Sequence, residues 1–267
     1  MMQRVLLVLA LVGSAAAGAV PVSAQSSPPA PPVADSASAA FFPRFAFHLN
    51  AEHLSSDDRR FVWDTNFGGE LDFVQYRQAS GTFYANYQAV LGEEFRAFDP
   101  SHGNYILGGL ATARIAGVDV GGGLHHESRH LSDRAKRFAV DWNMLGVRVR
   151  KTATRGALLV DARADMRGVV YASYVDYAWE LDSELRLRQT LRPGIGVILG
   201  SAVRLLGTDG SRGRGTQAGF REEGGVRLDG RGAAAELFVA VERRIDPYPL
   251  EFGTATWFTA GFRLLSR

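Results

Sequence analysis

The chain has 267 residues, a formal net charge of +2 and no cysteine, which excludes disulfides, thiol nucleophiles and cysteine-ligated metals. Acidic and basic residues are interleaved rather than clustered, so no nucleic-acid partner is expected. The 30 glycines, and an arginine-rich set of cations with only two lysines, accompany many aromatic and β-branched residues, a composition that favours sheet over helix.

The first 42 residues are set apart by composition. Residues 1–24 have a basic start, a short apolar stretch and a small-residue site at Val22-Ser23-Ala24, the order of a secretory signal peptide. Residues 25–42 are rich in Ser, Pro and Ala and predict a disordered tether. The apolar stretch is too short to span a membrane as a helix, and no later segment has the ~18 apolar residues that a spanning helix needs. Residues 43–267 therefore form the folded domain.

Alternation of apolar and polar residues predicts strands through the whole of this domain. The predicted strands are ~10 to 14 residues long, longer than those of most globular proteins and suited to tilted membrane-spanning strands. We predict twelve of them, at 43–54, 66–77, 82–95, 104–115, 118–129, 137–150, 157–169, 177–190, 195–207, 217–228, 232–243 and 254–265.

The connections alternate between short turns and longer polar loops, which is typical of an outer-membrane barrel. We therefore predict an all-β, antiparallel transmembrane β-barrel of about 12 strands, with short periplasmic turns and longer extracellular loops. Its expected location is the outer membrane of a Gram-negative-type bacterium, after signal-peptide cleavage, with membrane lipids and the barrel assembly machinery as partners. A soluble β-sandwich fits less well, because one face of many strands carries dense opposite charges while the other is almost wholly apolar.

The charged face predicts a lumen filled by ion pairs, in which the planar arginine side chain suits crowded carboxylates. A wide diffusion pore is therefore not expected. The residues predicted to fill the lumen are Asp161, Arg163, Asp165, Glu180, Asp182, Glu184, Arg186, Arg188, Arg204, Arg221, Glu223, Arg227 and Glu236.

Chemically active residue types concentrate in the segment 124–133, which contains His125, His126 and His130. His126-Glu127-Ser128-Arg129-His130 matches the H-E-x-x-H zinc pattern, which requires a helix. The preceding alternation indicates a strand, where His126 and His130 would lie ~13 Å apart, so no metal site is assigned.

A second pattern in the same segment is His126-x-Ser128. The strand phasing places both side chains on the lipid-facing wall, and a hairpin register summing to 269 sets Ser128 opposite Asp141 and His126 opposite Asn143. This arrangement predicts a serine nucleophile, Ser128, with His126 as base and either Asp141 or Asn143 as the orienting group. An ordinary polar girdle at the membrane interface is the alternative.

The segment His126-Glu127-Ser128, followed by Trp142-Asn143, resembles the outer-membrane phospholipase A family, and the His-x-Ser is shared with the lipid A deacylases. The fuller string, His126-x-Ser128-x-His130-Leu131-x-Asp133, resembles more closely a family of exported barrels of unassigned function. The phospholipase resemblance implies a lipid ester hydrolase and Ca²⁺, for which oxygens at Asp99, Ser132 or Asp133 are candidates. The sequence departs from the enzymes directly after the serine, where Arg129-His130 replaces the expected Asn-Gly.

Three classes of function stay open at this point. The first is a lipid acyl hydrolase acting on a phospholipid or lipid A ester. The second is a narrow channel, and the third is a structural or adhesive protein that uses its extracellular loops. A homodimer is also left open.

Overall fold

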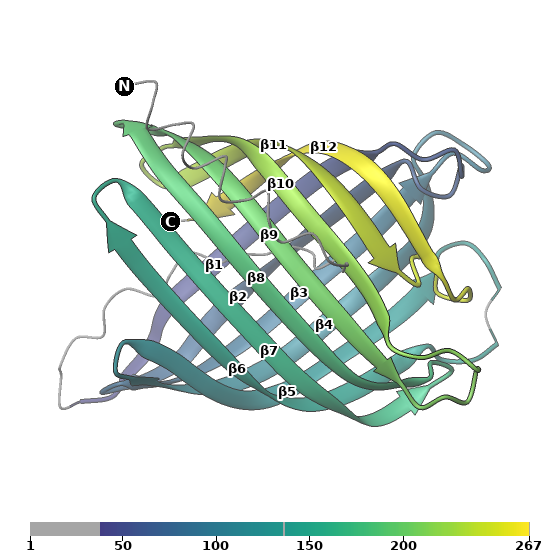
Figure 1. Ribbon diagram of the computed structural model, residues 1–267, viewed down its shortest axis with the longest axis horizontal. Helices are drawn as coiled ribbons and strands as arrows, with labels where there is room; N and C mark the ends of the chain where they lie inside the picture. Colours follow the sequence, from purple (N-terminus) through teal and green to yellow (C-terminus); the bar gives the residue numbers. More distant parts are fainter. Residues whose placement is uncertain (1–37, 136, 267) are drawn as a thin grey trace.

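The computed structural model describes residues 38–135 and 137–266, which form a closed barrel of twelve antiparallel strands (Figure 1). Each strand pairs with its neighbours in sequence, and the last returns to the first, with Asn50 opposite Arg263. The predicted fold class is confirmed. The strands are β1 (Ala40–Leu54), β2 (Trp63–Tyr76), β3 (Ala79–Gly92), β4 (Asp99–Ile115), β5 (Val118–Leu131), β6 (Asp141–Arg155), β7 (Leu158–Ser173), β8 (Tyr177–Arg192), β9 (Ile195–Thr208), β10 (Gln217–Asp229), β11 (Ala233–Ile245) and β12 (Thr254–Ser266).

The predicted signal peptide, 1–24, and most of the predicted tether, 25–42, lie outside the described residues. The last part of the tether range, from Ala40, already belongs to β1. No helix among the described residues is long and apolar enough to cross a membrane.

Several strand ends differ from the predicted ones. The loop between β3 and β4 occupies 93–98, not 98–103, because Asp99 and Ser101 are buried and continue the sheet. Strand β6 begins at Asp141, four residues later than predicted, and runs on through Arg155. Local alternation does not report such shifts, since polar residues that face the lumen resemble loop residues in sequence.

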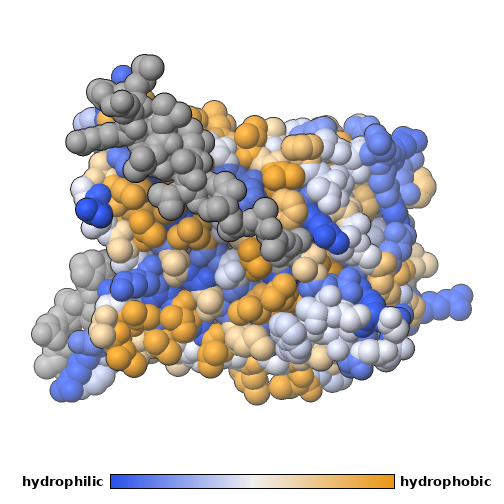
Figure 2. Space-filling view, viewed as in Figure 1, coloured by the Kyte–Doolittle hydropathy of each residue, from blue (hydrophilic) through white to orange (hydrophobic). Residues whose placement is uncertain are grey.

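The two faces of each strand differ as predicted. On β5, Val120 and Leu124 are exposed on the outer wall, whereas Glu127 and Arg129 are buried on the inner face. Figure 2 shows apolar side chains over much of the visible wall and hydrophilic ones gathered at the end where the longer loops lie. Glu222 departs from this pattern, because it lies on the outer face of β10 and accepts a hydrogen bond from Ser201 Oγ at 2.7 Å.

The lumen of the barrel is filled by a lattice of ion pairs, as the sequence predicted. Arg221, fully buried, bonds to Glu52, Glu223 and Glu242 at 2.6 to 3.1 Å. Arginine suits this position because one guanidinium can serve several carboxylates at once. Toward the loop end the lumen also holds two apolar clusters, one centred on Trp142 and the other on Trp257.

Short turns at one end of the barrel fix the strand registers that matter for the site. The turn between β4 and β5 is Ala116-Gly117, and both residues have positive φ, 50° and 76°. Two positive φ angles are the signature of a type I′ turn, whose twist matches that of the paired strands. The turn sets Tyr105 opposite Ser128.

Candidate functional site

The candidate site lies on the outer wall of the barrel, near the loop end of β5 and β6. The predicted register is confirmed, with His126 opposite Asn143 and Ser128 opposite Asp141. Ser128 is three residues from the end of β5, and Asp141 is the first residue of β6. The four sequence-predicted residues therefore share one small patch of wall, half-buried between neighbouring side chains.

His126 is held by Asn143. The distance between His126 Nδ1 and Asn143 Oδ1 is 2.8 Å. An amide oxygen can only accept, so this bond assigns the proton to Nδ1 and leaves Nε2 of a neutral His126 with a free lone pair. That is the tautomer a general base needs.

Ser128 contacts His130, to which the sequence reasoning assigned no catalytic role. Ser128 Oγ lies 3.3 Å from Nε2 of His130. His126 and His130 flank Ser128 at two residues on either side, and all three point outward because side chains on a strand alternate. The serine thus stands between two imidazoles, one of which is oriented by Asn143.

Asp141 and Asn143 were alternatives for the orienting group, and they take different positions. Asn143 contacts the histidine, whereas Asp141 faces the serine across the hairpin. Asp141 Oδ1 is buried and has no hydrogen-bond partner among the described residues.

An aromatic row, which the sequence reasoning missed, continues the site along the wall. Phe67 is opposite Tyr87, Tyr87 is opposite Tyr105, and Tyr105 is opposite Ser128. The rings of Tyr87 and Tyr105 lie 4.7 Å apart, and Tyr105 meets His130 edge-on at 5.2 Å. The signal was present in the sequence, since the Ala116-Gly117 turn fixes the Tyr105 register in the same way that the next hairpin fixes Asp141. Aromatic rows of this kind mark the interfacial girdle of outer-membrane barrels.

The strand conformation separates the residues of the H-E-x-x-H pattern. His126 and His130 point outward, whereas Glu127 is buried in the lumen, 3.5 Å from Arg129. The helical face on which this pattern binds zinc is not formed.

The loop oxygens considered for calcium are occupied by arginine. Asp99 pairs with Arg134 at 3.0 Å, Asp133 pairs with Arg96 at 2.9 Å, and the Ser132 carbonyl accepts from Arg134 at 2.9 Å. Guanidinium groups at these oxygens repel a divalent cation. Asp99, Ser132 and Asp133 therefore do not fit a calcium site.

Arg134 also fixes the loop above the site. It joins the β5–β6 loop to the β3–β4 loop through Glu94 and Asp99. Burial alone would lower the pKa of Arg134, but the hydrogen bonds to these carboxylates outweigh it and raise the pKa above its ordinary value. The loop is therefore anchored by a permanent cation.

No family model and no curated protein matches this sequence. Among solved structures, the chain is similar to outer membrane phospholipase A from Escherichia coli, at 13% identity and a TM-score of 0.52, over 83% of this chain and 92% of that chain. The outer membrane phospholipase dimer of Salmonella typhi with bound calcium is 14% identical, with a TM-score of 0.53, over 83% of this chain and 90% of that chain. An active-site mutant of the Escherichia coli protein, with asparagine changed to alanine, is 14% identical, with a TM-score of 0.53, over 85% of this chain and 91% of that chain. At such identities the likeness shows the fold, that of an outer-membrane β-barrel.

Proposed function

We propose that this chain is a lipid acyl hydrolase of the bacterial outer membrane. The observation that carries the proposal is the His126–Asn143 hydrogen bond on the same outward row as Ser128, at the loop end of a barrel wall. A nucleophile at this height meets the ester groups of membrane lipids, which lie just below the head groups. The active-site asparagine named for the Escherichia coli phospholipase mutant supports giving Asn143 the orienting role.

The proposed reaction begins with attack of Ser128 Oγ on an ester carbonyl carbon. The hydroxyl proton passes to Nε2 of His126, which then gives it to the departing lipid alcohol. Water hydrolyses the acyl-serine by the same route in reverse order, so one ester and one water yield a fatty acid and a deacylated lipid. Ser128 Oγ lies against His130 in the structure, so the scheme requires rotation about its Cα–Cβ bond toward His126.

In this scheme Asn143 is a positioning residue and Asp141 is not the orienting group. Asn143 Oδ1 accepts a hydrogen bond from His126 Nδ1–H throughout, which keeps the Nε2 lone pair available to the serine. The aromatic row ending at Tyr105 supplies a flat apolar surface beside the nucleophile, against which an acyl chain packs.

The test uses the purified, folded full chain in mixed micelles of detergent and phospholipid, with lipid A as a second substrate. Fatty acid release is measured by mass spectrometry, together with labelling by a serine-reactive fluorophosphonate. Ser128→Ala is expected to abolish both. Ser173, which lies two strands away on the same row, provides the matched control, and Ser173→Ala is expected to retain both. Equal release by wild type and Ser128→Ala would leave the non-enzymatic barrel, a narrow channel or an adhesive protein, as the function.

The proposal also includes the substrates, the assembly route and the export of the protein. Outer-membrane lipids are the substrates, the barrel assembly machinery inserts the chain, and the signal peptide is removed on export. The dimer reported for the Salmonella typhi phospholipase makes a homodimer conceivable for this chain. Membrane fractionation and cross-linking in native outer membranes test these assignments.

A further inference from the structure

The lumen is divided into two chemically different parts. From β6 to β12 it is filled by the ion-pair lattice, in which Arg186, for example, bonds to Glu223 at 3.1 Å and to Glu236 at 2.9 Å. The wall from β1 to β4 also carries buried carboxylates, such as Glu52 and Asp72, but adds buried amides. These are Asn50, Asn66, Asn86, Gln88 and Asn104.

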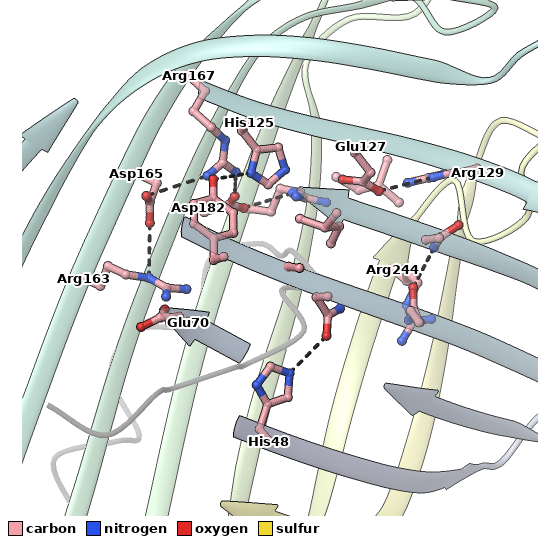
Figure 3. A pocket seen from close by; sticks show the side chains of 18 of the residues that line it. His48, Glu70, His125, Glu127, Arg129, Arg163, Asp165, Arg167, Asp182 and Arg244 are labelled. Atoms are coloured by element: carbon pink, nitrogen blue, oxygen red, sulfur yellow. Dashed lines mark hydrogen bonds and ion pairs between the residues drawn. The ribbon is translucent and has the colours of Figure 1, made fainter. Parts of the chain in front are cut away.

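Two cavities lie in series in the lumen; the loop-side one is lined by β1 to β9 and β11, and the turn-side one by β1 to β6. The loop-side cavity, lined among others by Glu70 and Arg129, has a volume of about 140 Å³ (Figure 3). Its lining extends to Asp246, at the start of the β11–β12 loop. The turn-side cavity has about 90 Å³ and reaches from Glu70 to Gln78 in the β2–β3 turn. A water molecule needs ~10–15 Å³ of such space, so the two cavities have room for about ten and about six waters.

Two side chains stand between the cavities, because Glu70 and Arg148 line both. Arg44 donates to Glu70 at 3.0 Å, and Arg148 donates to Asp165 at 2.6 Å while lying 5.8 Å from the ring of Tyr84. We call Glu70 and Arg148 the constriction.

The loop-side cavity is also closed toward the loops. Arg129 donates to the carbonyl oxygen of Asp246 at 2.7 Å, and both residues line this cavity. The path is therefore bridged by one bond at the loop side, while at the constriction Glu70 is held by Arg44 and Arg148 by Asp165.

Among the side chains that line the two cavities, the buried polar atoms without a hydrogen-bond partner are mainly donors. Arg44 Nη1 in the turn-side cavity, and Arg167 Nε and Asn86 Nδ2 in the loop-side cavity, are buried without a hydrogen-bond partner among the described residues. Asn104 Oδ1 is an unpartnered acceptor, and His125 Nε2 takes either role. In each cavity the lining arginines outnumber the lining carboxylates by one. Arginine-lined pores favour anions.

We infer that this part of the lumen is a gated path for small inorganic anions, with Glu70 and Arg148 as its narrowest point. The path does not involve the outer-wall site, because Ser128 and His126 face away from the lumen. Ser128→Ala is accordingly expected to leave conduction unchanged, so this inference and the hydrolase proposal fail or hold separately.

The experiment is single-channel recording of the full chain in planar bilayers under a KCl gradient. Wild type is expected to open in small steps, with a reversal potential displaced toward that of chloride. Arg148→Ala is expected to increase the step size by ~3-fold or more, because it removes the side chain that narrows the path. Asp165 keeps Arg163 at 3.2 Å in this variant, so the fold should tolerate the change. Arg148→Gln serves as the milder second variant.

Arg186→Ala is the matched control. It removes an ion-paired arginine from the filled part of the lumen, and Glu223 and Glu236 keep Arg263 as a partner. Its step size is expected to equal that of wild type. Silence of wild type and both Arg148 variants, a reversal potential on the potassium side, or an equal increase with Arg186→Ala would each overturn the inference. Heat-dependent migration in gels establishes that every variant is folded.

Discussion

Arg221 allows the strength of the luminal lattice to be tested at a single point. Its guanidinium bonds to Glu52 through both terminal nitrogens, at 3.1 and 2.9 Å, and to Glu242 at 2.6 Å. Glu242 has a second cation in Arg244 and Glu223 has one in Arg263, whereas Glu52 pairs with no other cation among the described residues. Loss of Arg221 therefore leaves one buried carboxylate, that of Glu52, without compensation.

Arg221→Met keeps the length of the side chain and removes its charge. Breaking a buried ion pair by removing one partner costs about 3–5 kcal/mol, and the 2% exposure of Arg221 places it in that regime. The assay is urea unfolding of the barrel in lipid vesicles, where the free energy of unfolding follows from the midpoint and slope.

The second variant, Arg221→Met with Glu52→Gln, tests whether the uncompensated Glu52 carboxylate causes the loss of stability. An amide at position 52 needs no cation, so most of the lost stability is expected to return, and the double-mutant cycle gives the coupling between the two residues. The reasoning is refuted if Arg221→Met costs less than about 1 kcal/mol, or if Glu52→Gln deepens the loss.

Three further outcomes are expected. Asn143→Ala should lower the rate of acyl release by about 100-fold through loss of His126 orientation, whereas His130→Ala should cost less than about 10-fold; the reverse order would assign the base to His130. Gly123→Ala should lower the free energy of unfolding by about 1–3 kcal/mol, because its Cβ would lie 2.1 Å from the Gly109 carbonyl oxygen. Gly122→Ala, whose nearest atom is 3.7 Å away, should change that free energy by less than about 0.5 kcal/mol in the same urea titration. Glu222→Leu should raise the free energy of unfolding by about 1–2 kcal/mol, because it removes a carboxyl from the lipid-facing wall, and a decrease would show that this carboxyl is needed for the fold.

The fold could be predicted from the sequence because period-two alternation persists along the whole barrel. The register at the site followed from the same pattern, since the parity of Leu124 and Leu145 on the outer wall allows few pairings of β5 with β6. Ser128 and Asp141 were therefore placed correctly as partners across the hairpin.

Side-chain hydrogen bonds could not be predicted in this way. Parity places His126, Ser128 and His130 on one face, but it does not decide which histidine the serine contacts or whether Asn143 or Asp141 reaches His126. Those outcomes depend on rotamers and on side chains from β3 and β4, such as Tyr105 against His130. The cavities in the lumen could not be predicted from the sequence either, because the number of charges on each strand does not reveal where the paired side chains leave space.

Closure of the barrel by β1 and β12 has a consequence for biogenesis. The Phe47 amide donates to Ser266 Oγ at 2.6 Å across a sequence separation of 219 residues, so the first strand to be synthesised must wait for the last. Until then both strands are open edges, able to pair with other chains. Contacts of such high order make folding slow, and a chain truncated before Thr254 would keep two open edges permanently. Pairing of β1 with β12 is thus the step that completes folding after synthesis and removes the open edges that could aggregate.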